Sequence, residues 1–357
     1  MKAVILAAGQ GTRLRPVTLT MPKPLVPVAN QPLIFYAINV LKNAGLTEIA
    51  IVINGLDSPI RTVLGDGSKL GVQLDYIVQR EQLGLAHAVK LTQDFVGDEP
   101  FCVLLGDNIF QDKMVDLIRD FPASEAHVAV ALIEVPDPSR FGIAEIENGK
   151  IKRVVEKPKE PPSNLAISGA YLFKSTIFEA IAQIQPSGRN EYEITDAIQK
   201  MIDLGHIVHP YTLKGWWIDA GKPDAIIQGN QLVLGDLPFT LPPDDKERVI
   251  GKCDISARVI LGTNCQIIDS VIRGPAIIGD NVIVRNSYIG PYTALGDNVV
   301  IENSEIDASI VMQNCYIRNI PGRIDSSLIA DNSQVEAADR VPTAHRFILA
   351  ENSFVRL

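Results

Sequence analysis

The chain has 357 residues, of which 46% are hydrophobic and 21% charged, and its formal net charge is −9 at pH 7. This composition predicts a water-soluble globular protein with room for two domains. The negative charge argues against nucleic acid or a membrane surface as a general partner, because phosphate backbones and anionic lipids repel an acidic protein.

The N-terminal apolar run is shorter than the apolar core of a secretory signal, and no stretch has the length of a membrane span. We therefore expect a cytoplasmic protein. The four cysteines are far apart in the sequence and form no Cys-x-x-Cys pair: Cys102, Cys253, Cys265 and Cys315. Scattered thiols of this kind are most often reduced core residues.

The chain opens with an apolar run, Lys2 to Ala7, that ends at Gly9-Gln10-Gly11. This pattern is typical of a buried parallel strand that leads into a tight loop. Glycines let the backbone approach a ligand closely, so amide groups can converge on an anion. Arg13, Arg15 and Lys23 follow, and together with the loop they indicate a nucleotide triphosphate site. Taken alone, the two glycines also suit a plain structural turn, because the stretch lacks both Gly-x-Gly-x-x-Gly and a P-loop.

Predicted strands and helices then alternate. Helical spacing predicts helices at residues 33–44 and 86–95, and short apolar runs predict buried strands at 49–53, 74–79 and 101–105. This order is typical of a doubly wound α/β domain, in which ligands bind at the carboxyl ends of the strands. Residues 128–173 predict an antiparallel extension, so we expect a mixed, Rossmann-like sheet. Further helices at 175–184, 194–204 and 225–234 and a strand at 212–219 complete a first domain at residues 1–235.

The second half of the chain has a different period. Residues 236–247 are rich in proline and acid and predict a linker. Apolar residues then recur every six positions, with Gly-Asp-Asn turns between them: Val271, Ile277, Ile283, Ile289, Leu295 and Ile301. A six-residue step predicts a left-handed parallel β-helix with three such steps in each coil, which we place at residues 248–357. Arg273 interrupts the step, and the register is less regular after Asp307.

Two aspartates stand at the ends of predicted strands. Asp107 lies in Leu105-Gly106-Asp107-Asn108, and Asp219 lies in Trp217-Ile218-Asp219-Ala220. Each alone would suit a turn-capping residue. Beside a triphosphate site, carboxylates suit Mg²⁺, which takes one or two protein oxygens and completes its shell with phosphates and water. We therefore predict Asp107 and Asp219 as Mg²⁺ ligands.

The N-terminal stretch Gly9-x-Gly11-Thr12-Arg13-Leu14-x-Pro16, with Pro22-Lys23-Pro24-Leu25-x-Pro27, resembles the signature of the sugar-1-phosphate nucleotidylyltransferases. This family transfers a nucleotidyl group to a sugar 1-phosphate with Mg²⁺ and releases pyrophosphate. The resemblance covers nearly the whole chain, including residues 270–275 and 286–291. It is closest to the long form of the glucose-1-phosphate thymidylyltransferases, a branch of this family that carries the β-helix.

The resemblance implies a role for each matching position. It implies catalytic roles for Arg13, Lys23, Asp107, Lys157 and Asp219. It implies nucleotide contacts for Leu6, Ala8, Gly9, Gly11, Thr12, Arg13, Gln79 and Gly84. It implies sugar-phosphate contacts for Asn108, Gly142, Glu156, Lys157, Ile167 and Arg189. On the residues alone, Glu156 with Lys157 also suits a surface ion pair, and Gln79 also suits a strand end.

The reaction implied is transfer of a thymidylyl group from dTTP to glucose 1-phosphate. The alternatives are uridylyl or guanylyl transfer to glucose or mannose 1-phosphate, and a non-catalytic regulatory or assembly protein. Gln79 disfavours guanine, whereas uracil differs from thymine by one methyl group. Acyl transfer by the β-helix would need a histidine at a coil edge, and the only histidine beyond His209 is His345. We expect a homo-oligomer that docks through the β-helix.

Overall fold

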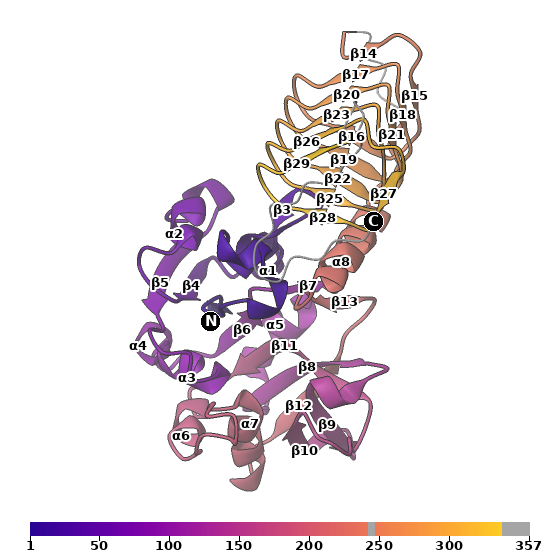
Figure 1. The fold of residues 1–357 in the computed structure, drawn as a ribbon. Helices are drawn as coiled ribbons and strands as arrows, with labels where there is room; N and C mark the ends of the chain where they lie inside the picture. Colours follow the sequence, from indigo (N-terminus) through magenta and orange to yellow (C-terminus); the bar gives the residue numbers. More distant parts are fainter. Residues whose placement is uncertain (242–246, 338–357) are drawn as a thin grey trace. The chain divides into compact units, whose positions relative to one another are not determined.

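The computed structural model describes residues 1–241 and 247–337 (Figure 1). The chain packs as two compact units. The first contains Met1–Gln10, Pro22–Leu25 and Leu33–Asp219. The second contains Gly11–Met21, Val26–Pro32 and the described residues from Ala220 onward. Two segments before residue 33 thus group with the second unit, and the domain bounds expected from the sequence, residues 1–235 and 248–357, stay predictions. His345 and the end of the predicted β-helix lie outside the described residues.

The first unit is built on a nine-stranded mixed sheet in the order β10-β9-β11-β6-β1-β4-β5, with β8 and β12 attached through β11 (Figure 1). The parallel half is β1 (Lys2–Leu6), β4 (Glu48–Ile53), β5 (Gln73–Val78) and β6 (Phe101–Leu105). The rest is β8 (Val128–Glu134), β9 (Gly142–Glu147), β10 (Lys150–Glu156), β11 (Leu165–Phe173) and β12 (Val208–Thr212). A second, two-stranded sheet joins β7 (Asn108–Phe110) to β13 (Trp217–Asp219). The predicted fold class of this unit is confirmed.

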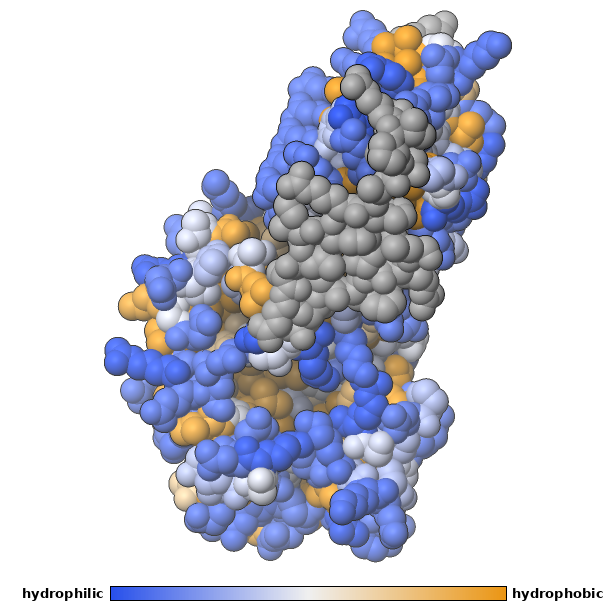
Figure 2. All heavy atoms as spheres, viewed as in Figure 1, coloured by the Kyte–Doolittle hydropathy of each residue, from blue (hydrophilic) through white to orange (hydrophobic). Residues whose placement is uncertain are grey.

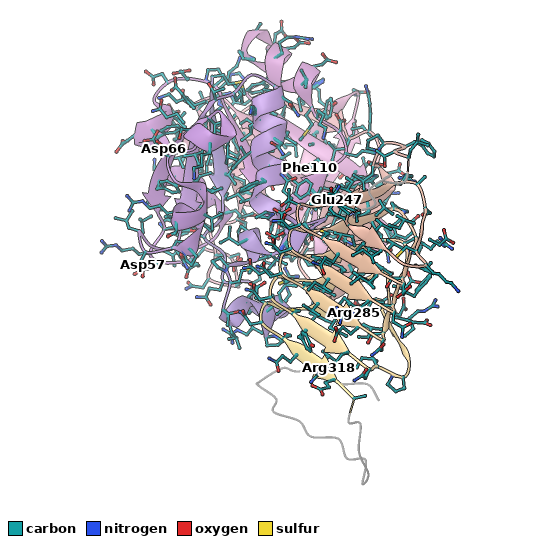
Figure 3. The ribbon with its side chains drawn as sticks, turned by 90° about the horizontal axis from the view of Figure 1, so that it is seen from above. Asp57, Asp66, Phe110, Glu247, Arg285 and Arg318 are labelled. Carbon is teal, nitrogen blue, oxygen red and sulfur yellow. The ribbon has the colours of Figure 1, made fainter. Side chains whose placement is uncertain are left out.

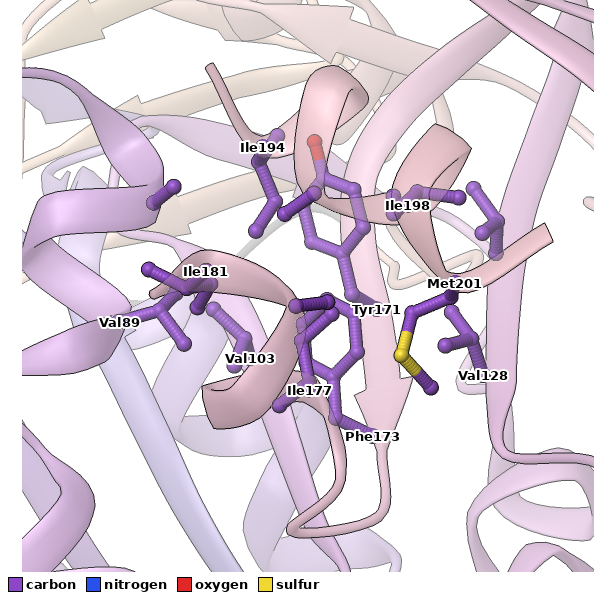
Figure 4. Close-up of a cluster of buried hydrophobic side chains, with 14 of the residues drawn as sticks. Val89, Val103, Val128, Tyr171, Phe173, Ile177, Ile181, Ile194, Ile198 and Met201 are labelled. Atoms are coloured by element: carbon purple, nitrogen blue, oxygen red, sulfur yellow. The ribbon is translucent and has the colours of Figure 1, made fainter. Parts of the chain in front are cut away.

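Seven helices belong to this unit: α1 (Leu33–Asn43), α2 (Pro59–Leu64), α3 (Leu85–Lys90), α4 (Gln93–Val96), α5 (Val115–Asp120), α6 (Ile177–Ile181) and α7 (Ile194–Asp203). Figure 4 shows how α6 and α7 bury their apolar faces against β11, with Ile177, Ile198 and Met201 beside Tyr171 and Phe173. All five side chains are at most 4% exposed. Burial of such side chains is the main source of stability here, at about 1.5–3 kcal/mol each.

Two predicted elements are wrong in their bounds. The helix predicted at 86–95 is interrupted, because Thr92 is fully buried and its Oγ1 donates to Val89 O at 2.7 Å. The strand predicted at 212–219 is divided between β12 and β13. Gly215 lies between them with φ +80°, where a β-carbon would meet Gln111 Oε1. That backbone conformation favours glycine and ends the extended run.

His127, which precedes β8, gives the fold a pH dependence. Its ring centroid lies 4.3 Å from that of His206. Burial, and then the charges of His206 and Lys174, lower the pKa of His127 below its ordinary 6.5. Because the folded state favours the neutral ring, the stability that His127 contributes is present above pH 6.5 and is lost as the pH falls through the lowered pKa.

We expect urea denaturation to show this loss directly. Between about pH 7 and about pH 5, the free energy of unfolding of the wild-type chain should fall relative to that of the His127→Gln variant. The same pH dependence in both proteins would contradict a neutral His127 in the folded state.

The second unit is a three-sided, left-handed parallel β-helix, as predicted. One side contains β14 (Val249–Ile250), β17 (Gln266–Ile268), β20 (Ile283–Arg285), β23 (Val300–Glu302), β26 (Tyr316–Arg318) and β29 (Gln334–Glu336). The second contains β15 (Asp254–Ile255), β18 (Val271–Ile272), β21 (Tyr288–Ile289), β24 (Glu305–Asp307) and β27 (Arg323–Asp325). The third contains β16 (Val259–Leu261), β19 (Ala276–Ile278), β22 (Thr293–Leu295), β25 (Ile310–Val311) and β28 (Leu328–Ile329).

The central coils have 17 residues rather than three equal steps of six. Asp280 N donates to the Asp297 side chain 17 residues later, at 2.8 Å. The buried inward row runs through Ile272, Ile278, Val284 and Ile289, so its last step is five residues. Val271, Ile277 and Ile283 are therefore only partly buried, whereas Ile289, Leu295 and Ile301 are fully buried, because this shorter side shifts the register by one position.

Stacked side chains join the coils. At one corner Asn264, Asn281, Asn298, Asn314 and Asn332 take positive φ, and each of the first four donates a side-chain hydrogen bond to the next at 3.0–3.2 Å. On one side of the β-helix, Arg285 and Arg318 (Figure 3) pair with Glu302 and Glu336 on the following coils at 3.0 and 2.9 Å. Asparagine tolerates positive φ, so the corner residues satisfy the backbone requirement and link the coils together.

Helix α8 (Pro223–Gly235) belongs to the second unit through one buried amide. Ala29 N donates to Asn230 Oδ1, and Asn230 Nδ2 donates to Tyr292 O, both at 2.8 Å. Ala29 lies in the turn between β2 (Pro27–Val28) and β3 (Gln31–Pro32). Because buried amides need partners, these bonds explain why α8 and the hairpin group with the β-helix.

The exposed surface and the cysteines have the properties of an ordinary globular protein. The face drawn in Figure 2 is mostly hydrophilic, with hydrophobic residues scattered over it. Within residues 1–241 and 247–337, no helix has the length and apolarity to cross a membrane. The four cysteines are free thiols, and three of them are buried, as predicted for core residues.

Candidate active site

Two distant strand ends lie side by side in the first unit. Strand β6 ends at Leu105, and Gly106 and Asp107 lead into β7. Strand β13 pairs antiparallel with β7, which places Asp219 opposite Asn108. Pairing of these two short strands therefore brings Asp107 and Asp219, the predicted metal ligands, to one place.

The Lys23 ammonium lies between the two aspartates. Lys23 begins a 3₁₀ turn, η3 (Lys23–Leu25), and its Nζ forms an ion pair with Asp107 Oδ2 and lies 3.6 Å from Asp219 Oδ1. Its side chain is 9% exposed and each aspartate is 28% exposed. An ammonium at this depth needs opposite charge, because loss of hydration is costly. Two carboxylates around one cation leave the cluster with a negative charge.

The donor set fits Mg²⁺. The Asp107 and Asp219 oxygens already converge on a cation, the Lys23 ammonium, and carboxylate oxygens are the ligands that Mg²⁺ prefers. In the described ranges, Asn108 Oδ1 is buried and accepts no hydrogen bond, which leaves a further oxygen beside the pair. The same ranges contain no group of three or more His, Cys, Asp or Glu side chains that could hold a metal. A two-carboxylate site that relies on phosphates and water for its other ligands is consistent with this.

A second cluster forms around Glu156 at the end of β10. Glu156 Oε1 lies 3.2 Å from Lys157 Nζ and 3.1 Å from Arg189 Nη2, and its Oε2 accepts from Thr195 Oγ1 at 3.2 Å. A β-carbon on Gly142 would lie 3.2 Å from Glu156 Oε2 and 3.4 Å from Ile167 Cδ1. Five predicted sugar-phosphate residues are thus neighbours: Gly142, Glu156, Lys157, Ile167 and Arg189.

This cluster borders a cavity of about 750 Å³. Its lining includes Glu156, Lys157, Arg189, Glu193 and Asp196. Burial, and then the charges of Glu193 and Glu156, raise the pKa of Asp196 above its ordinary value. The cavity therefore mixes cations with acids, a combination that can bind an anionic group and hydrogen-bond to hydroxyls.

The predicted nucleotide residues of the first unit lie along its strand ends. Leu6 and Ala8 are buried, whereas Gly9 is exposed and a β-carbon there would meet no described atom within 4 Å. Gln79 is 4% exposed, and its Nε2 donates to Gly84 O at 3.2 Å and lies 3.1 Å from His87 Nδ1. The amide nitrogen of Gln79 is therefore engaged inside the protein.

Gly84 has a packing reason as well as a predicted ligand role. Its φ is +105°, and a β-carbon would lie 2.5 Å from Tyr192 O.

The remaining predicted nucleotide residues, Gly11, Thr12 and Arg13, belong to the second unit. Gly11 has φ +62° and precedes η1 (Thr12–Leu14), which contains Thr12 and the exposed Arg13.

Sequence reasoning did not single out Glu193, Thr195 or Asp196. Glu193 is 5% exposed, and Thr195 and Asp196 follow it at the start of α7. A sequence signal was available, because all three lie within five residues of Glu191 in the Arg189-x-Glu191-x-Glu193-x-Thr195-Asp196 stretch. What the sequence could not show is that Thr195, on helix α7, donates a hydrogen bond to Glu156 at the end of strand β10.

The nucleotidyl transferase family model matches residues 2–235 of this chain. The chain belongs to the nucleotidyl transferase family. This nucleotidyltransferase is 42% identical to the low-salt glycan biosynthesis nucleotidyltransferase Agl11 of Haloferax volcanii, over 100% of both chains. It is 40% identical to a glucose-1-phosphate thymidylyltransferase of Streptomyces griseus, over 99% of this chain and 98% of the relative.

A solved structure from Bacillus anthracis supports the fold of the nucleotidyltransferase unit. Its assignment as a glucose-1-phosphate thymidylyltransferase is itself provisional, and it is 39% identical with a TM-score of 0.62. The match covers 67% of this chain and 97% of that one.

Proposed function

We propose that the protein transfers a thymidylyl group from dTTP to α-D-glucose 1-phosphate. An oxygen of the sugar phosphate bonds to the α-phosphorus of dTTP while the bond from that phosphorus to the pyrophosphate oxygen breaks. The reaction needs no protein nucleophile, because the sugar phosphate itself attacks. It needs no general base either, because the attacking phosphate oxygen carries no proton. The protein therefore contributes alignment and positive charge.

The observation that carries the proposal is the convergence of Asp107 and Asp219 at Lys23 in a chain of this family. The two carboxylates would hold Mg²⁺, which supplies positive charge to the phosphate oxygens when bound. Lys23 and Arg13 bind the triphosphate. Lys157 and Arg189 bind the phosphate of the sugar, and Glu156 accepts hydrogen bonds from its hydroxyls.

Gln79 supports selection of the base. Its Nε2 is held by the Gly84 carbonyl, which can only accept, so the Oε1 atom is left to accept from a base. Thymine and uracil carry an N3–H donor, and cytosine does not. We therefore expect dTTP and UTP to be used and CTP to be rejected, whereas guanine also carries a ring N–H donor and is tested in the assay below.

A nucleotide competition assay tests the proposal. The full chain is incubated with MgCl₂, glucose 1-phosphate and each of dTTP, UTP, CTP and GTP, and the sugar nucleotide is measured by chromatography. We expect the highest kcat/KM with dTTP, and a value for UTP lower by roughly 10-fold to 200-fold, the usual effect of one methyl group in an apolar pocket. Transfer from GTP alone, or from none of the four, would contradict the proposal.

The intact Lys23, Asp107 and Asp219 cluster also argues against a non-catalytic homologue.

A further inference from the structure

Arg189 contacts three carboxylates at the edge of the 750 Å³ cavity. Its Nη2 lies 2.7 Å from Glu193 Oε1 and 3.1 Å from Glu156 Oε1, and its Nε lies 3.6 Å from Glu191 Oε2. A guanidinium presents several donors in a fixed plane, so the carboxylates that hold it decide where its remaining donors point. The position of Arg189 therefore depends on which of the three is fixed.

Burial distinguishes the three partners. The Glu193 side chain is 6% exposed, compared with 21% for Glu156 and 43% for Glu191. Ser187 Oγ also donates to Glu193 Oε1 at 2.7 Å. A carboxylate this deeply buried must keep its partners, because an unpaired buried charge is costly. Glu193 is thus the fixed anchor, and the more exposed acids can exchange.

The backbone also holds Glu193 in place. It is the N-cap residue of α7, a ten-residue helix, and Ala197 N donates to Glu193 O at 3.3 Å. The amino end of a helix favours negative charge. Its backbone is therefore held by α7 while its side chain reaches Arg189.

Glu156 is the exchangeable partner. Its Oε1 is shared by Lys157 at 3.2 Å and Arg189 at 3.1 Å, the two cations assigned to the sugar phosphate. A phosphate oxygen is negatively charged and binds paired cations, as this carboxylate oxygen does. When phosphate replaces it, Glu156 is released to the sugar hydroxyls while Glu193 keeps the guanidinium in place.

We propose that Glu193 is a positioning residue that holds Arg189 in the sugar-phosphate subsite so that phosphate can displace Glu156. This inference rests on the proposed function, since it takes glucose 1-phosphate as the ligand. Without the Glu193 charge, Arg189 follows its exchangeable partners, Glu156 and Glu191, and its side chain is already 38% exposed.

The test compares Glu193→Gln with Glu191→Gln, which removes the exposed partner of the same arginine. We expect Glu193→Gln to raise KM for glucose 1-phosphate by roughly tenfold or more, the usual scale for one charged hydrogen bond. The kcat and the KM for dTTP should stay within about twofold of wild type. We expect Glu191→Gln to behave like wild type. In an Arg189→Ala background, adding Glu193→Gln should have no further effect, because the group that it positions is gone.

Equal KM values for glucose 1-phosphate in the Glu193→Gln and Glu191→Gln variants would overturn the inference. So would a Glu193→Gln variant whose main defect is a lower kcat. A further rise in KM when Glu193→Gln is added to Arg189→Ala would also overturn it. If Glu193→Gln does not fold, judged by circular dichroism, Glu193→Asp keeps the charge on a shorter side chain and should show the same selective rise in KM. A wild-type chain that neither turns over nor binds glucose 1-phosphate by calorimetry would instead refute the proposed function.

Discussion

Replacing Asp107 by Asn is expected to lower kcat by about 100-fold to 1,000-fold, the usual effect of losing one preorganised electrostatic contact in an active site. The amide has nearly the shape of the carboxylate but lacks its charge, so it binds Mg²⁺ poorly. Lys23 retains Asp219 at 3.6 Å, and we expect the variant to fold. The rate of pyrophosphate release measures the effect.

Asp116→Asn is the matched control for this prediction. Asp116 lies on α5 with 77% of its side chain exposed, and its partner is the exposed Arg119. Surface ion pairs of this kind contribute little, so its rate should equal that of wild type. An Asp107→Asn variant as fast as Asp116→Asn would remove Asp107 from the metal role.

Replacing Lys23 by Met is expected to reduce kcat/KM for dTTP by a similar factor, about 100-fold to 1,000-fold. The change deletes the cation between Asp107 and Asp219 and one proposed triphosphate contact. Two carboxylates then face each other without that counter-charge, so we also expect a lower melting temperature in metal-free buffer and partial recovery on addition of Mg²⁺.

The exposed Lys69 supplies the control, because Lys69→Met removes the same charge from the surface. It should leave both kcat/KM and the melting temperature near wild type. A Lys23→Met variant whose melting temperature is unaffected by Mg²⁺ would contradict a shared cation site at this cluster.

The sequence was sufficient for the fold class, because the fold class depends on local patterns of apolar and polar residues. The apolar run Phe101–Leu105, for example, forms a buried strand, as its short length and turn-forming neighbours predict. The polar residues after such runs, Asp107 among them, lie at strand ends. The functional roles of the site residues stay predictions. The domain boundaries, the cytoplasmic location and the homo-oligomer also stay predictions.

Long-range packing accounts for what the sequence could not show. The meeting of Asp107 with Asp219 requires the β7–β13 pairing, which no local pattern specifies. The register of the β-helix depends on one side of each central coil that is five residues long. A search for a uniform six-residue step does not detect this shorter side. In the sequence, Glu193 is an ordinary acidic residue before a predicted helix. Only the structure shows that its side chain is buried and paired with Arg189. In each case the deciding contact joins segments that sequence periodicity treats separately.

We propose that Asp107 and Asp219 together hold the divalent cation of nucleotidyl transfer. Anomalous diffraction from Mn²⁺ in crystals of the full chain grown with dTTP tests it most directly. We expect a single peak within about 2.5 Å of a carboxylate oxygen of each aspartate and beside the phosphates of the nucleotide. A bound nucleotide whose Mn²⁺ is held by other residues, away from both aspartates, would contradict it.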